Sequence, residues 1–194
     1  MAGMSQMRII IAGFGGQGVV LTGNLIARAA LKENKNVTGM VAYGAEMRGG
    51  TAFAAVIVSD DEIACPFVET PDSAIVLNQP SLDKFEPDVA AGGLLLVNTS
   101  LVKRGPKRED IDRIFVPATE IAQRLGQLKV ANLAALGAFV RHTGLVKEES
   151  IRQAVKDLFA EKNPTLTEVN LAAFDAGLEQ SRFQKAVCSA PKKR

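Results

Sequence analysis

A glycine-rich segment near the start of the chain has the spacing of a phosphate-binding turn. It follows the apolar run Arg8–Ala12 and precedes apolar residues at helical spacing between Val20 and Ala29. Glycines at the head of a helix let an anion approach backbone N–H groups and the positive end of the helix dipole. The alternative is a turn that serves only close packing of helix on strand. The residues that would contact an anion or a cofactor are Gly13, Gly15, Gly16, Gln17 and Gly18.

The position of acidic residues argues against an ordinary NAD-dependent dehydrogenase. Such an enzyme needs a carboxylate at the end of the second strand, about 20 residues beyond the glycines. The strand predicted there ends at Val41–Tyr43, with Glu33 before it and Glu46 beyond it. Neither carboxylate occupies the required place.

A second glycine-punctuated segment, Tyr43–Thr51, predicts a binding loop or a subunit-contact loop. In an extended segment, Glu46 and Arg48 project to the same side and form either an ion pair that pins the loop or a clamp for an anionic group. Tyr43 is a candidate for stacking or hydrogen bonding. The candidate residues are Tyr43, Gly44, Glu46, Arg48, Gly49 and Gly50.

The remaining composition restricts the classes of function. Two distant cysteines, Cys65 and Cys188, and one histidine, His142, offer no ligand spacing for zinc or an iron–sulfur cluster. The formal charge of +2 does not favour nucleic acid or an anionic membrane as a partner. No apolar run is long enough for a transmembrane helix and no secretory signal is evident, so we expect a cytoplasmic protein. We nominate no catalytic residue and no metal ligand.

The elements that must position these residues alternate as in an α/β protein. Short strands are predicted at Val37–Tyr43, Thr51–Val58, Ser73–Leu77, Gly93–Val97 and Arg113–Val116. The acidic turn after Thr51–Val58 and the stop at Pro66 suggest a hairpin to an antiparallel edge strand, Ile63–Cys65. Polar residues after two strands, Asn78–Pro80 and Asn98–Ser100, either present ligand-binding groups or satisfy turns.

The last third of the chain is predicted to be helical. The helices are Thr119–Leu125, Asn132–His142, Lys147–Ala160 and one that begins near Asn163–Pro164. Asn132 either caps its helix or turns toward the crevice beside the glycine turn. Small residues at Asn170, Ala173 and Gly177 share one helix face and favour close packing on another helix.

Together these elements predict a three-layer α/β fold. We expect a mostly parallel, Rossmann-like sheet with an antiparallel edge hairpin, helices on both faces and a helical C-terminal third. A single domain is expected over 1–194, with a structured core over 7–185 and a flexible basic tail over 186–194.

The two glycine-containing segments, in this order and spacing, resemble those of the gamma subunit of the 2-oxoacid:ferredoxin (or flavodoxin) oxidoreductases. This family includes pyruvate, 2-oxoglutarate, 2-oxoisovalerate and indolepyruvate oxidoreductases. The resemblance extends from Arg8 to about Phe183. It implies a gamma catalytic domain within an enzyme complex that oxidatively decarboxylates a 2-oxoacid to acyl-CoA, CO2 and reduced ferredoxin.

The resemblance also implies that other chains carry the cofactors. Thiamine diphosphate and Mg2+ would be held mainly by alpha and beta subunits, iron–sulfur clusters by beta or delta subunits, and coenzyme A would be a substrate of the complex. This chain would hold no cofactor alone, would complete or orient the shared site, and would be inactive in isolation, where it can form a homodimer. The substrate expected from the resemblance is 2-oxoglutarate, then pyruvate. The alternatives are a stand-alone Rossmann-like nucleotide-binding oxidoreductase and a non-catalytic interaction module.

Overall fold

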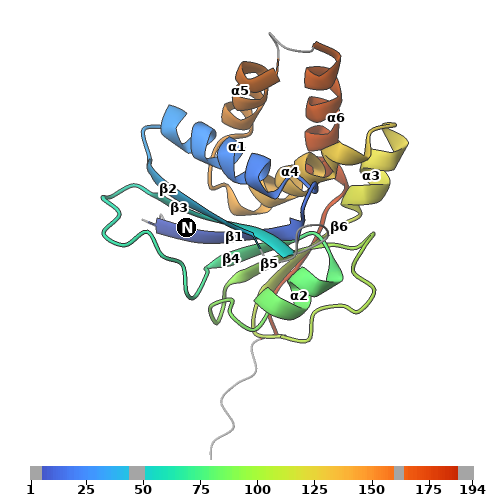
Figure 1. Cartoon of the computed structure of the whole chain (residues 1–194). Coiled ribbons are helices and arrows are strands. Elements are labelled where there is room, and N and C mark those ends of the chain that lie inside the picture. Colours follow the sequence, from blue (N-terminus) through green and yellow to red (C-terminus); the bar gives the residue numbers. More distant parts are fainter. Residues whose placement is uncertain (1–5, 44–50, 160–163, 188–194) are drawn as a thin grey trace, which may run out of the picture.

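The computed structural model describes residues 6–43, 51–159 and 164–187 (Figure 1). Its centre is a seven-stranded sheet in the order β2-β3-β1-β4-β5-β6-β7. The strands are β1 Gln6–Phe14, β2 Asn36–Tyr43, β3 Thr51–Ser59, β4 Ser73–Val76, β5 Leu94–Asn98, β6 Asp112–Val116 and β7 Arg182–Gln184.

Helices cover both faces of the sheet. They are α1 Val19–Lys32, α2 Gln79–Phe85, α3 Ala118–Arg124, the 3-10 turn η1 Leu128–Val130, α4 Ala131–Thr143, α5 Glu148–Phe159 and α6 Pro164–Gln180. Figure 1 shows α2 on one side of the sheet and α1 with the C-terminal helices on the other. The predicted three-layer α/β class and the helical C-terminal third are confirmed.

Strand β1 lies in the middle of the sheet because its residues are apolar on both faces. Ile9 and Ile11 pack in the core beneath α1, whereas Ile10 and Ala12 pack in the core beneath α2. All four are 3% exposed or less. The strand pairs in parallel with β4 and antiparallel with β3, so neither of its edges is free.

The sheet has an antiparallel edge hairpin, but its second strand is not the one predicted. Strand β3 pairs with β1 on one side and with β2 on the other. Ile63–Cys65 therefore has no free edge of β3 to join, and this segment is not a strand. The edge strand of the hairpin is β2, and the prediction of Ile63–Cys65 as that strand is wrong.

Three short elements, α2, η1 and β7, were not predicted from the sequence. Asn78 precedes α2 and accepts a hydrogen bond from the backbone N–H of Ser81 at 2.9 Å. With Pro80 in the first turn, this is a typical helix start that the pattern around Asn78 could have shown. Strand β7 consists of three exposed residues and has no apolar pattern to reveal it.

Close contact between α4 and α6 depends on glycine. A Cβ added to Gly177 would collide with the backbone carbonyl group of Ala134, and one added to Gly137 would collide with that of Phe174. The predicted close packing through Gly177 is confirmed. Gly126 and Gly144 follow α3 and α4 in the left-handed conformation, as helix stops do.

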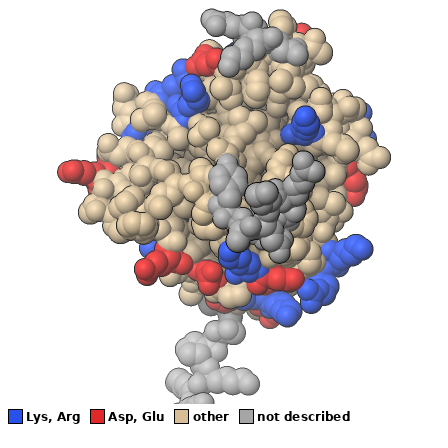
Figure 2. All heavy atoms as spheres, viewed as in Figure 1, with Lys and Arg blue, Asp and Glu red and all other residues tan. Residues whose placement is uncertain are grey.

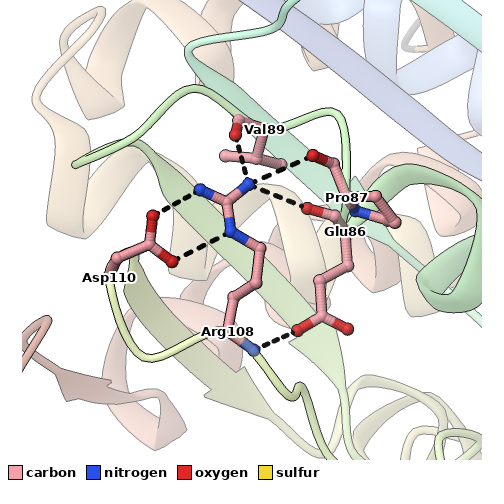
Figure 3. A network of polar contacts seen from close by, with 5 residues as sticks. All are labelled: Glu86, Pro87, Val89, Arg108 and Asp110. Atoms are coloured by element: carbon pink, nitrogen blue, oxygen red, sulfur yellow. Dashed lines mark hydrogen bonds and ion pairs between the residues drawn. The ribbon is translucent and has the colours of Figure 1, made fainter.

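The long connection between β5 and β6 is held by Arg108 (Figure 3). Its Nη1 donates to the carbonyl oxygens of Glu86, Pro87 and Val89, while Nε and Nη2 donate to the carboxylate of Asp110. The planar guanidinium satisfies several acceptors at once, which a lysine ammonium cannot do in the same geometry. The connection is thereby fastened to the end of α2.

No helix in the described part of the chain is long and apolar enough to cross a membrane. The expectation of a single domain over 1–194, with its core and tail boundaries, stays a prediction.

Candidate functional site

The candidate site lies where the carboxyl ends of β1, β4 and β5 meet. The helix after β1 packs on one face of the sheet, and the helix after β4 packs on the other. Two neighbouring parallel strands whose helices diverge leave a crevice between their following loops. The glycine turn after β1 forms one wall of this crevice.

The glycine turn has the backbone conformation that its residues predict. Gly16 and Gly18 have φ angles of 94° and 73°, which side chains with a Cβ rarely adopt. The backbone N–H of Gln17 donates to the carbonyl oxygen of Phe14 at 3.1 Å and closes the turn. Gly18 is the N-cap of α1 and supplies no side chain, so the first N–H groups of the helix have no capping acceptor there.

Gln17 ties this turn to the next strand. Its side-chain oxygen accepts hydrogen bonds from the backbone N–H of Phe14 at 2.6 Å and from Nδ2 of Asn78 at 2.8 Å. A Cβ at Gly13 would lie 2.8 Å from that oxygen, so Gly13 leaves the room in which Gln17 folds back. The amide oxygen of Gln17 therefore serves the structure of the turn.

Asn132 does not cap its helix. Helix α4 begins at Ala131 with Val130 as N-cap and no side-chain capping bond. Asn132 instead donates through Nδ2 to the carbonyl oxygen of Gly18 and to Oγ1 of Thr22, both at 3.2 Å. The capping interpretation is wrong, because the side chain points inward and is 1% exposed. The alternative, that Asn132 turns toward the glycine turn, describes its position.

A crevice of about 240 Å³ opens beside the glycine turn. Asn98 anchors its floor by donating through Nδ2 to the carbonyl oxygen of Leu77 at 3.1 Å and to Oγ1 of Thr119 at 2.9 Å. The lining residues are Gly16, Gln17, Leu77, Asn98, Leu101, Thr119, Leu128, Lys129 and Ala131. Of the predicted candidates, Gly16, Gln17 and Asn98 line this crevice.

Among the described residues, the polar side chains that line the crevice are two amides, one hydroxyl and one ammonium group. Its lining holds no carboxylate, histidine or cysteine, and Lys129 is its one charged residue in the described part of the chain. The positive end of α1 lies beside it. Among the described residues, no group of three or more His, Cys, Asp or Glu side chains could hold a metal ion.

Several lining residues were not anticipated. Leu101, Leu128 and Lys129 come from turns whose short sequences have no periodic pattern. Thr119, which lines the crevice, and Thr22, which does not but bonds Asn132, gave no signal because each depends on an asparagine from a distant segment. Only the packing of these segments reveals their roles.

The second predicted segment lies mostly outside the described residues. This applies to Gly44, Glu46, Arg48, Gly49 and Gly50. The backbone of Tyr43 ends β2 opposite Ala52, and Thr51 pairs with Phe14. Both flanks of the segment therefore lie at the same end of the strands as the glycine turn.

His142 lies near the end of α4, within hydrogen-bond distance of Oγ of Ser181 at 3.0 Å and stacked on Phe183. Burial lowers the pKa of His142, and the positive charge of Arg141 lowers it further. An imidazole held between two side chains has a structural role here.

The fold and the crevice define an α/β protein of the Rossmann-like class, with a ligand-type crevice at the carboxyl ends of its parallel strands. The sequence matches the family model "Pyruvate ferredoxin/flavodoxin oxidoreductase" over residues 8–180. The chain belongs to this family, and the resemblance stated from its two glycine segments is confirmed.

Individual relatives agree with this assignment. The chain is 38% identical over 180 residues to the 2-oxoglutarate synthase subunit KorC of Methanocaldococcus jannaschii, covering 91% of this chain and 95% of the relative. It is 41% identical over 179 residues to the ketoisovalerate oxidoreductase subunit VorA of Methanothermobacter marburgensis. That match covers 91% of this chain but only 37% of the VorA subunit, so the chain spans little more than a third of that relative.

A solved structure supports the same fold. The gamma subunit of a keto/oxoacid ferredoxin oxidoreductase from Geobacter sulfurreducens superposes with a TM-score of 0.77 at 32% sequence identity. The match covers 90% of this chain and 97% of that subunit. The arrangement of the sheet and helices therefore matches that of this gamma subunit.

Proposed function

We propose that this chain is the gamma subunit of a multi-subunit 2-oxoacid:ferredoxin or flavodoxin oxidoreductase. The complex would convert a 2-oxoacid and coenzyme A to acyl-CoA and CO2, and two electrons would pass to ferredoxin or flavodoxin. The observation that carries this proposal is the family match over residues 8–180, joined by a full-length match to a KorC subunit. We place the complex in the cytoplasm, as expected from the sequence.

In this proposal the chain binds and orients, while partner subunits hold the reactive groups. Thiamine diphosphate with Mg2+ would supply decarboxylation chemistry from the alpha and beta subunits, and clusters in the beta or delta subunits would carry electrons. The lining of the crevice supports a binding role because it contains no pair of nucleophile and base. Its volume of about 240 Å³ is below that of sites that enclose a whole ligand, about 300–1,000 Å³, so the crevice by itself does not enclose a molecule as large as coenzyme A.

The residues of this chain that would face an anionic group are those of the glycine turn and Lys129. Gly15 and Gly16 are exposed at the turn, and the ammonium of Lys129 is exposed at the rim of the crevice. The segment from Tyr43 to Gly50, with Glu46 and Arg48, would either add a clamp for the same anion or contact another subunit. Gln17 and Asn132 would hold the turn in place through the bonds described above.

The substrate that we propose first is 2-oxoglutarate, because the KorC relative matches this chain over nearly its whole length. Ketoisovalerate is the second candidate, since the VorA subunit has 41% identity to this chain. Pyruvate follows. The residues that contact the side chain of the 2-oxoacid and determine substrate specificity would lie in partner subunits.

The proposal is tested by co-expressing this chain with the alpha and beta subunits of such a complex. The purified complex should reduce ferredoxin or a redox dye only when both a 2-oxoacid and coenzyme A are present. Comparing 2-oxoglutarate, ketoisovalerate and pyruvate by kcat/KM identifies the substrate. If the chain alone reduces NAD with a substrate, it is a stand-alone oxidoreductase. If it binds no catalytic subunit, the proposal is also wrong.

The role of the Tyr43–Gly50 segment is tested by Arg48→Ala, with Arg104→Ala as an exposed control. A raised KM for coenzyme A in a fully assembled complex would support an anion clamp. Loss of assembly would support a subunit contact. Unchanged assembly and unchanged kinetics would show that Arg48 takes no part in the site.

A further inference from the structure

The mouth of the crevice carries two exposed leucines. Leu101 follows β5 and is 39% exposed, and Leu128 lies on η1 and is 62% exposed. Both line the same crevice although they come from different connections. Large apolar side chains gathered at one opening indicate a surface that another molecule covers.

Several polar side-chain groups that line the crevice already make hydrogen bonds within the chain. The side-chain oxygen of Gln17 already accepts two hydrogen bonds, and Nδ2 of Asn98 already donates two. Oγ1 of Thr119 accepts one of these bonds. Because these groups are satisfied within the chain, an occupant gains mainly from covering the apolar walls. The first N–H groups of α1 beside the crevice have no capping acceptor, so the occupant that fits best combines an apolar side chain with a hydrogen-bond acceptor.

The charges around the crevice further restrict the kinds of partner that could occupy it. Lys129 stands exposed at the rim and is the one charged lining residue in the described part of the chain. Figure 2 shows that uncharged residues form most of the described surface on this face of the molecule, with many of the charged side chains gathered along its lower border. Depletion of charge is typical of the core of a protein–protein interface. A partner that fits would carry an apolar side chain with a carboxylate near it.

We infer that the crevice between Leu101 and Leu128 is the socket for a partner subunit of the complex. The partner inserts one apolar side chain between the two leucines and places a carboxylate against Lys129. This inference rests on the proposed function and assigns the partner to a surface of this chain. The small volume of the crevice, about 240 Å³, suits one inserted group rather than a whole cofactor.

The test compares three variants in the full chain: Leu128→Gln, Leu101→Gln and, as a control, Leu31→Gln. Leu31 is 60% exposed but lies in the last turn of α1, at the end of that helix away from the glycine turn. The dissociation constant for the purified catalytic subunits is measured by titration calorimetry. Each crevice variant should bind about tenfold more weakly or worse, and the control should bind within about twofold of the wild type. Thermal unfolding shows that every variant is folded.

The charge contact is tested by Lys129→Glu and Lys129→Arg. Reversal of the charge should weaken binding at low salt by about tenfold, and the conservative change should keep most of the affinity. The difference should shrink at high salt because the pair lies at a rim.

The outcomes separate the inference from the proposed function. If the wild-type chain binds no catalytic subunit, the proposed function fails and the inference with it. If it binds and the crevice variants bind as tightly as the wild type, the inference alone is overturned. A raised KM for coenzyme A with unchanged subunit affinity would also overturn it, because the crevice would then hold a small molecule.

Discussion

The side chain of Asn132 donates a hydrogen bond to the carbonyl oxygen of Gly18 at 3.2 Å, although the two residues are far apart in the chain. A Cβ on Gly18 would lie 2.5 Å from Nδ2 of the same asparagine. The glycine turn and the first turn of α4 therefore depend on each other. The wall of the crevice is set by this contact as much as by the turn itself.

Gly18→Ala should destabilise the fold by about 2 kcal/mol or more. The φ angle of 73° costs a residue with a Cβ about 1–2 kcal/mol, and the methyl group must also displace the amide of Asn132. Urea unfolding measures the loss. Gly15→Ala is the matched control, because a Cβ there meets no atom within 4 Å. Equal stability of the two variants would show that the contact between Gly18 and Asn132 is easily relaxed.

Gly177→Ala should separate α4 from α6. Alanine has the better helix propensity by about 1 kcal/mol, but its methyl group would collide with the backbone of Ala134, which cannot rotate away. We expect a net loss of about 2–4 kcal/mol in the free energy of unfolding, since overpacking a backbone contact costs more than the propensity gains. Thermal unfolding provides the measurement. Gly105→Ala, where a Cβ meets open space, should leave stability within about 0.5 kcal/mol. A stabilised Gly177→Ala protein would contradict the close contact.

Arg108→Lys should loosen the connection between β5 and β6. Lysine keeps the charge but loses the planar set of donors that reaches Asp110 and three carbonyl oxygens. The free energy of unfolding should fall by about 1–3 kcal/mol, because carbonyl groups that are partly buried lose a charged donor. Hydrogen exchange should also rise along residues 99–111.

The control for this variant is Arg104→Lys. Arg104 makes an ion pair with Asp83 whose side chains are 66% and 48% exposed, so its loss should be nearly neutral. An Arg108→Lys protein as stable and as protected from exchange as this control would show that the guanidinium network contributes little.

His142 should make the protein less stable as the pH falls below about 6.5, the usual pKa of an exposed histidine. Burial lowers the pKa of His142 in the folded state, with a smaller effect from Arg141, so the unfolded chain takes up a proton first. The stabilisation is complete above the unfolded pKa and declines as the pH falls toward the folded pKa. The measurement is urea unfolding of the wild type and of His142→Gln between pH 8 and pH 5. The difference between the two proteins should change over this range, and a constant difference would contradict the lowered pKa.

Six strands of the sheet, β1 to β6, could be predicted because each is a short apolar run that ends in glycine, proline or a polar residue. β4, β5 and β6 were located to within a residue or so in this way. The same reasoning failed for Ile63–Cys65, because an apolar triplet does not show whether a strand edge is available to pair with it. That edge of β3 is occupied by β2.

The candidate site could be predicted only in part. Gly16 and Gln17 were found from spacing and do line the crevice, whereas Leu101, Leu128 and Lys129 were not found. Asn132 was assigned first to a helix cap, since asparagine near a helix start commonly has that role. Its true partners lie on α1, and no local pattern points to them.

The sequence by itself determined the α/β class, the glycine turn at the head of α1 and the family to which the chain belongs. Each of these depends on local patterns: apolar periodicity, residues that permit unusual backbone angles, and motifs in a given order. The tertiary structure decided which strands are neighbours, which way Asn132 points and which residues line the crevice. These features depend on packing between distant segments, where burial and hydrogen-bond satisfaction of the whole chain select one arrangement over others that the local sequence allows equally.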